Sequence, residues 1–255
     1  MTVILSNFGV GGLVGLTGVA GFLLPIVYTG LLQMSVTQGL ALSFAAFILS
    51  GALGSFNYKK AGNLDVSFGL RLSAGSMAGA VLGVKLNLII PEEQVKILLY
   101  VVVLLSGISI LLRKDGKAAE TEKKAAAGAK EKGFRLEKHL VPTLLLGFVT
   151  GLICALSGAG GPILVMPLLV VFGTGVRVAV GIALFNSIFI GIPACIGYMS
   201  QCDVPALLPV LAAALASHGV GVYLGSKNAV RINQGVLKRG IAVFSILIAV
   251  WKLFL

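Results

Sequence analysis

Long apolar runs separated by short polar breaks dominate the chain, and this pattern predicts membrane-spanning helices. Six runs are each long enough for one helical crossing of a bilayer, which takes about 18 or more residues. They cover residues 36–56, 66–90, 95–112, 176–199, 204–226 and 236–255. We therefore expect an all-α polytopic membrane protein.

Two further apolar segments are interrupted near their middle. One reads LTGVAGFLLPIV from Leu16, and the other reads LSGAGGPILVMP from Leu156. Glycine and proline break helices, and an arm such as residues 3–16 spans only about 21 Å of a ~30 Å hydrocarbon core. Each segment is therefore predicted to enter the membrane, turn and leave on the same side. The tips of these re-entrant hairpins are residues 17–21 and 157–161.

Similar positions recur in the same order in the two halves of the chain, which indicates an internal repeat. The matching pairs are Leu16 and Leu156, Gly18 and Gly158, Gly21 and Gly161, Gly39 and Gly181, Gly79 and Gly221, and Gly83 and Gly225. Paired halves of this kind are typical of secondary transporters. We predict an N-terminal repeat at residues 1–112, a charged connector at 113–139 and a C-terminal repeat at 140–255. Each repeat would be a re-entrant broken-helix hairpin plus three transmembrane helices.

Composition and charge support this assignment. The chain is 57% hydrophobic and only 11% charged, whereas soluble domains contain about 25% charged residues. Its net charge is +11, but the basic residues lie in loops and in the connector, so membrane orientation explains them better than nucleic-acid binding does. If the broken segments re-enter, the repeats are inverted and 17 Lys and Arg face one side against three on the other; if they cross, the split is 13 to seven.

The positive-inside rule favours the two inverted repeats. They place the chain in the cell (inner) membrane with the connector in the cytoplasm and both termini outside.

A helix broken inside a bilayer exposes the N-termini of half-helices, whose free N–H groups and positive dipole ends form an anion site. Glycines at the break let the backbone approach a ligand, and the two hydroxyl residues at matching positions can add donors. A glycine-rich kink used only for close packing is the alternative. The predicted anion-binding residues are Thr17, Gly18, Gly21, Ser43, Ser157, Gly158, Gly160, Gly161 and Asn186.

Other polar residues within the spans are candidates because their burial in a bilayer is costly. Asn186 either bonds a neighbouring helix or coordinates substrate, and Ser43 lies at a similar depth in the partner span. Arg71 is expected to snorkel to the cytoplasmic face, with anion pairing as the alternative. His218 either carries a coupling proton or is a hydrogen-bonded structural histidine.

Several features have structural explanations. Asp65 and Asp203 stand at span entrances, where helix N-capping is expected. Small residues spaced by four, at positions 75, 79 and 83 and at 217, 221 and 225, permit close helix contact in lipid. The three cysteines are expected to be packed as small hydrophobes.

At its two glycine-rich motifs the sequence resembles the TauE/SafE family, the sulfite exporter family of membrane proteins. The resemblance covers nearly the whole chain, including GLALSF from Gly39 and GIALFN from Gly181. Val19 and Ala20 stand where that family commonly has glycine, so SGAGG is the better match. The resemblance implies transport of a small sulfur-containing anion such as sulfite or a sulfonate, with export as the direction. An anion channel and an uptake permease for another small anion are the alternatives.

The expected partners are therefore a small sulfur anion, the lipid bilayer and, through His218, a coupling proton; a homodimer remains open. No cofactor, metal or nucleic acid is expected. The chain has no Walker motif for ATP and no H-E-x-x-H zinc motif, so an enzyme is not expected.

Overall fold

The structure is a computed structural model of the whole chain. It describes residues 1–91 except Val19, residues 139–228 except Gly173, and single positions between 93 and 108, at 136 and between 243 and 250. The apolar runs at 95–112 and 236–255 and the connector therefore fall largely outside the described residues.

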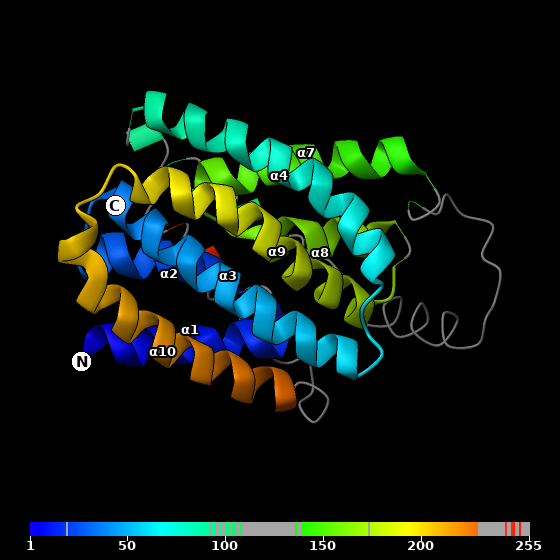
Figure 1. Cartoon of the computed structure of the whole chain (residues 1–255), viewed down its shortest axis with the longest axis horizontal. Coiled ribbons are helices and arrows are strands. Elements are labelled where there is room, and N and C mark those ends of the chain that lie inside the picture. The colour runs from blue at the N-terminus through cyan, green and yellow to red at the C-terminus, as the bar shows by residue number, and fades with distance from the viewer. Residues whose placement is uncertain are drawn as a thin grey trace.

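The described segments are helices joined by short turns (Figure 1). The helices are α1 (Thr2–Thr17), α2 (Leu23–Ile26), α3 (Val36–Lys60), α4 (Val66–Ile89), α7 (Leu140–Ser157), α8 (Gly161–Val171), α9 (Val176–Met199) and α10 (Val204–Asn228). A 3₁₀ turn, η1 (Ala20–Phe22), precedes α2, and a π-helical segment, η2 (Val27–Leu31), follows it. The predicted all-α class is thus confirmed.

Five of these helices, α3, α4, α7, α9 and α10, are long and apolar enough to cross a membrane. Helix α1 and the segment Ala20–Leu31 are shorter, as predicted for the arms of a re-entrant hairpin. Helix α7 is longer than expected for such an arm, because its 18 residues reach the length of a full crossing. The helix set is consistent with a polytopic membrane protein.

Side chains at the helix starts explain where the long helices begin. Ser35 and Gln38 form a capping box before α3, and the Asp65 carboxylate accepts a 2.9 Å hydrogen bond from Phe68 N at the start of α4. Asp203 accepts one of 3.4 Å from Ala206 N before α10. Each bond satisfies a backbone donor that a helix start leaves free. The capping roles predicted for Asp65 and Asp203 are confirmed.

Three helix pairs form the core of the molecule. Helices α1 and α10 lie along one side, α4 and α7 along the other, and α3 and α9 pack between them (Figure 1). Helices α3 and α9 are antiparallel: Gly54 on α3 lies against Leu184, whereas Phe44, earlier on α3, lies against Gly191.

The two outer pairs are parallel and packed through glycine. A Cβ atom on Gly79 of α4 would lie 2.0 Å from the carbonyl oxygen of Phe148, and one on Gly225 of α10 would lie 2.2 Å from that of Gly12. Only glycine permits backbones to approach this closely. The predicted packing role of the small-residue ladders is therefore confirmed.

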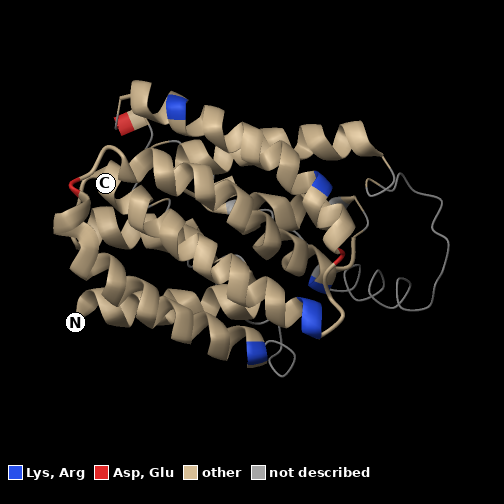
Figure 2. Cartoon of the chain, in the orientation of Figure 1, with Lys and Arg blue, Asp and Glu red and all other residues tan. Residues whose placement is uncertain are grey.

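Charged residues of the described helices lie at or within two turns of the helix ends (Figure 2). Lys59 and Lys60 end α3, and Lys227 lies in the last turn of α10. The middle of the bundle is mostly apolar, with large fully buried side chains that include Tyr28, Tyr198, Phe22 and Phe44.

Candidate functional site

Both predicted helix breaks are present, at equivalent positions of the two halves. Helix α1 ends at Thr17 and α7 ends at Ser157, and the following residues, Gly18 and Gly158, have left-handed φ angles of 70° and 72°. Their N–H groups donate to Val14 O at 2.7 Å and Cys154 O at 2.9 Å. A left-handed glycine is a common helix ending because glycine has no Cβ to resist positive φ. The glycine pattern therefore predicted both ends correctly.

The second tip has a further glycine in a conformation that other residues avoid. Gly160 has φ 78° and ψ 150°, a region used essentially by glycine alone. It is the N-cap of α8, which begins at Gly161, so Pro162 occupies the second helical position. Proline costs no hydrogen bond there, because N–H groups in the first turn of a helix have no acceptor within the helix.

The returning arm of the first hairpin differs from the α-helical half-helix that the sequence predicted. Residues 20–31 pass from a 3₁₀ turn through a four-residue α-helix to a π-helical segment. Pro25 lies inside this arm and lacks the N–H that a regular helix would need. The first arm therefore has no extended α-helical N-terminus comparable to that of α8.

One aromatic ring connects the two tips. A Cβ atom on Gly21 would lie 2.8 Å from Cε1 of Phe47, and one on Gly160 would lie 3.1 Å from Cε2 of the same ring. Phe47 belongs to α3 and is 2% exposed. The outer edge of its ring therefore lies between the first and second hairpins. Phe47 was not predicted from the sequence, because a phenylalanine in an apolar span has the same pattern as an ordinary core residue.

The other two tip glycines contact the central helices. Gly18 lies against Val180 of α9, and Gly158 lies against Leu40 of α3. Added Cβ atoms there would lie 2.6 Å and 2.0 Å from side-chain carbons. Each tip therefore packs against at least one of the two central helices.

The hydroxyl residues lie at the tips, but their protons are directed into their own helices. Thr17 Oγ1 donates to Leu13 O and Ser157 Oγ donates to Ile153 O, each at 2.7 Å. Ser157 Oγ also accepts from Ala159 N at 3.3 Å. Ser43 is buried on α3 and donates to Gly39 O at 2.6 Å. Each hydroxyl would have to rotate to donate a hydrogen bond to an anion.

Asn186 is fully buried on α9, and among the described residues neither Nδ2 nor Oδ1 has a hydrogen-bond partner. Leu184 and Ile188 of the same helix face α3. Asn186 lies about 200° around the helix from each of them, so it lies on a different face of α9 from the one that contacts α3. An unpaired buried amide is costly, and Asn186 remains a candidate polar contact.

His218 lies between α10 and α1, fully buried. Its Nδ1 donates to the carbonyl oxygen of Asn7 at 3.3 Å, and within the described part of the chain Nε2 has no partner. The Asn7 side chain in turn accepts a 2.9 Å hydrogen bond from the Tyr28 hydroxyl. This arrangement links His218 to the returning arm of the first hairpin, and Asn7 and Tyr28 were not singled out from the sequence.

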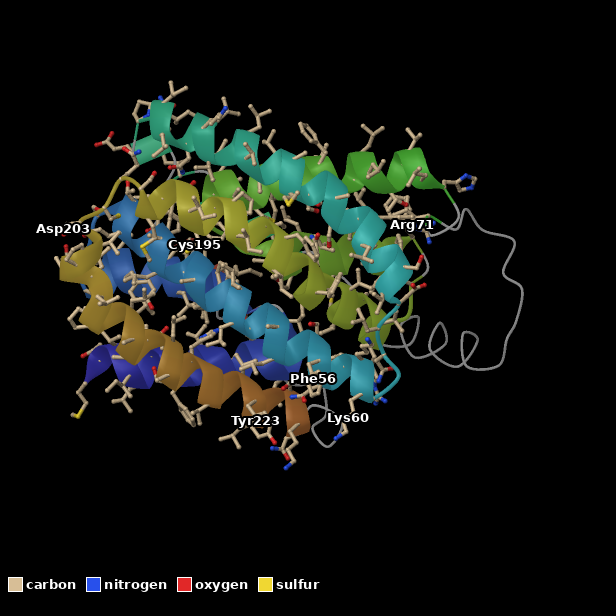
Figure 3. All side chains as sticks on the ribbon, in the orientation of Figure 1. Phe56, Lys60, Arg71, Cys195, Asp203 and Tyr223 are labelled. Atoms are coloured by element: carbon tan, nitrogen blue, oxygen red, sulfur yellow. The ribbon has the colours of Figure 1, made fainter. Side chains whose placement is uncertain are left out.

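Arg71 lies far from the second tip. Its guanidinium donates to Ser67 O at 3.2 Å, one turn nearer the start of α4 (Figure 3). On the same helix, Gly83 is the residue that lies against Ala155, near the end of α7. Twelve residues of helix correspond to about 18 Å, so the structure does not bring Arg71 to the second tip.

Two side chains that sequence analysis missed hold the end of α7. Asn87 Nδ2 of α4 donates to Leu156 O at 2.6 Å, and the Tyr198 hydroxyl of α9 donates to Ala155 O at 2.8 Å. These carbonyls lie in the last turn, where no helical donor remains. The Tyr198 ring also stacks on Phe44, whose ring meets Phe47 edge-on. The second tip is therefore fixed by both central and outer helices.

Comparison with known proteins identifies the family. The family model described as "Sulfite exporter TauE/SafE" matches residues 3–251. The "Probable membrane transporter protein YdhB" of Bacillus subtilis (strain 168) is 25% identical over 248 residues, which are 94% of this chain and 95% of that protein. No solved structure matches. Because the family model covers nearly the whole chain, this protein belongs to the TauE/SafE sulfite exporter family, a family of membrane transporters and not of enzymes.

Proposed function

We propose that this protein is a secondary transporter that exports a small sulfur oxyanion, sulfite or a sulfonate, across the cell membrane. The observation that carries the proposal is the pair of equivalent helix breaks, whose tips lie on either side of Phe47 in a chain of the TauE/SafE family. Broken helices with glycine-lined tips are a common way to place a polar site inside a membrane.

The proposed architecture is two inverted repeats, each a re-entrant hairpin plus three transmembrane helices. Helix directions support it. Helix α1 runs parallel to α10, since Gly11 lies against His218 and Gly15 against Val222. Helix α3 also runs parallel to α10, since Leu49 lies against Gly219 and Asn57, further along α3, is bonded to Ser226. Helices α7 and α9 both run parallel to α4, and α3 and α9 are antiparallel. The corresponding helices of the two halves, α1 with α7, α3 with α9 and α4 with α10, thus run in opposite directions. Alternating access would move one repeat or bundle against the other around the tips.

The anion would be held by backbone dipoles and not by a buried cation. The start of α8 has no side-chain cap, its first-turn N–H groups at residues 161 and 163 have no acceptor within the helix, and it carries the positive end of a helix dipole. Arg71 is bonded near the start of its own helix. Hydrogen bonds to a charged group contribute about 1.5–3 kcal/mol each, so a few of them give a micromolar to millimolar affinity. Such an affinity suits a carrier, because the anion must also be released.

Charge distribution supports a cytoplasmic connector and extracytoplasmic termini. Lys59, Lys60 and Arg71 flank the α3–α4 turn, and Arg177 and Lys227 lie at the start of α9 and the end of α10. Helix directions put these five at one end of the bundle, while Lys85 lies near the other end of α4 (Figure 2). The positive-inside rule assigns the richer end to the cytoplasm.

Flux into proteoliposomes tests the proposal. The purified protein should catalyse saturable uptake and counterflow of sulfite, measured beside sulfate, thiosulfate and methanesulfonate, with and without a pH gradient. Gly160→Val should abolish the flux, because valine cannot adopt the backbone conformation of the tip. Gly175→Val is the matched control: among the described residues no atom lies within 4 Å of an added Cβ there, and flux should persist.

Three results would contradict the proposal. They are ohmic, non-saturating current, which a channel would give; no flux of any of the four anions; and normal flux in Gly160→Val.

A further inference from the structure

The ring of Phe47 occupies the place where the proposed anion site would lie. All three atoms nearest to an added Cβ on Gly21 belong to this ring, and so do all three nearest to one on Gly160. The distal edge, from Cε1 through Cζ to Cε2, thus fills the space that side chains at both tips would otherwise take. The glycines at these positions make room for the ring.

Neighbouring aromatic groups hold the ring in this position. Phe44, one turn earlier on α3, meets Phe47 edge-on with ring centroids 5.5 Å apart and an interplanar angle of 88°. Tyr198 stacks on the other side of Phe44 at 5.8 Å, and its hydroxyl is bonded to Ala155 O in the last turn of α7. Phe47 is therefore packed as part of the second tip's support and is not a freely rotating side chain.

A phenyl edge suits a small anion but leaves no room for a large one. Its C–H groups carry partial positive charge, so an oxyanion can lie against them. They provide no strong hydrogen-bond donor, and affinity has to come from the backbone. Phe47 therefore acts sterically. Its ring limits how far a group attached to the sulfur atom can extend between the tips.

We propose that Phe47 determines the size of the anion that the protein accepts, favouring a compact oxyanion such as sulfite over sulfonates with an alkyl tail. This inference rests on the proposed function, since it concerns the same site. It names a specificity-determining residue on α3, a helix that contributes no residue to the hairpin tips themselves.

Competition against sulfite counterflow tests the inference. Proteoliposomes containing the wild type, Phe47→Leu or Phe47→Ala would exchange labelled sulfite in the presence of methanesulfonate or propanesulfonate. Removing the ring frees space for a propyl tail, and each methylene accommodated in an apolar space changes selectivity by about tenfold or more. In Phe47→Ala, the inhibition constant for propanesulfonate relative to that for methanesulfonate should fall by about tenfold or more. Phe47→Leu should change it in the same direction by less.

Phe68→Ala is the matched control. Phe68 is equally buried, at 1% exposure, but lies in the first turn of α4, where its N–H bonds to Asp65. Its removal creates a comparable cavity away from the tips, so the ratio of inhibition constants should stay at the wild-type value. If Phe47→Ala does not fold, Phe47→Leu retains apolar bulk and its ratio decides the question.

The outcomes separate this inference from the function on which it rests. A wild type that exchanges none of the anions overturns both. A wild type that exchanges sulfite, with the same ratio in the Phe47 variants, overturns the role of Phe47 and leaves the transport function standing. An equal change in Phe68→Ala would also overturn it, because the effect would then follow from any core cavity.

Discussion

Gly21 and Gly160 lie on either side of Phe47, but they are required for different physical reasons. Gly160 has a backbone conformation, φ 78° and ψ 150°, that a residue with a Cβ avoids. Gly21 has no positive φ angle, and its constraint is steric: an added Cβ would lie 2.8 Å from Phe47 Cε1. The two constraints can be separated by changing the ring.

Gly21→Ala should reduce sulfite counterflow strongly, and Phe47→Leu in the same chain should restore most of it. The added methyl group clashes with the aromatic edge of Phe47, and the smaller leucine side chain at position 47 leaves room for it. Gly160→Ala should not be rescued by Phe47→Leu, because its defect lies in the backbone. Flux in the two glycine variants, the two double variants and Phe47→Leu alone, normalised to the amount of folded protein, measures this.

If Phe47→Leu rescued both glycine variants equally, the steric role of Gly21 and the backbone role of Gly160 could not be separate. A failure to rescue Gly21→Ala, when Phe47→Leu alone is active, would also contradict the steric role of Gly21.

At the residue scale, the sequence predicted the helix ends that glycine and proline determine, but few of the side-chain contacts. Left-handed glycines after Thr17 and Ser157 follow from local sequence, because few other residues end a helix that way. The roles of Phe47, Asn87 and Tyr198 depend on which helices pack together, and no local pattern shows that. Likewise, the sequence placed Thr17 and Ser157 at the tips but could not show that their hydroxyls donate to the preceding turn.

At the scale of whole helices, the close packing of the pairs α1–α10 and α4–α7 depends on glycine. Gly79 lies so close to Phe148 of α7 that an added Cβ would meet its carbonyl carbon and oxygen. Since backbone cannot yield as a flexible side chain does, the two helices would have to separate. Asn87, further along α4, holds the end of α7, so separation would also disturb the second tip.

Gly79→Ala should therefore lower the melting temperature of the purified protein, by an amount that corresponds to an overpacking cost of about 1–3 kcal/mol. Gly9→Ala is the control: this glycine is exposed on α1, and an added Cβ would have no described atom within 4 Å. Its melting temperature should be unchanged or higher, because alanine favours helix over glycine. Thermal unfolding in detergent, followed by helical circular dichroism, measures both.

A Gly79→Ala protein as stable as the wild type would mean that α4 and α7 are not packed as tightly as the structure has them.

The element pattern was more predictable than the detail within each element. Apolar run length gave α3, α4, α9 and α10 with nearly correct bounds, since a spanning helix must be continuous in lipid. The returning arm of the first hairpin was predicted less well. Pro25 and the neighbouring glycines indicate a break, but they do not specify the 3₁₀, α and π segments that replace a regular helix there.

Across the whole molecule, charge and helix direction agree on which loops share a side of the membrane. From the sequence alone, the loops rich in Lys and Arg were predicted to lie on one side of the membrane. Lys60 and Arg71 lie at one end of the bundle, and Asp203 lies at the other (Figure 3). This agreement comes from independent sources, because contacts between glycines and their neighbours, and not charges, define the helix directions.

Accessibility of single cysteines tests the orientation. In a chain with Cys154, Cys195 and Cys202 replaced, Lys60→Cys should react with a membrane-impermeant maleimide only after the cells are permeabilised. Gln201→Cys, exposed after the end of α9, should react in intact cells whose outer layers admit the reagent. Each variant must retain sulfite counterflow, so that labelling reports the functional fold.

Thr2→Cys separates the two arrangements of the broken segment. If α1 and the returning arm re-enter on one side, residue 2 lies with residue 201 and reacts from outside. If the broken segment crosses the membrane, the repeats are parallel and residues 2, 60 and 201 share one side. Labelling of all three from the cytoplasm would therefore overturn the inverted repeats. Labelling of Lys60→Cys alone from outside would keep the inverted repeats and reverse their orientation, placing the basic loops on the side that the positive-inside rule disfavours.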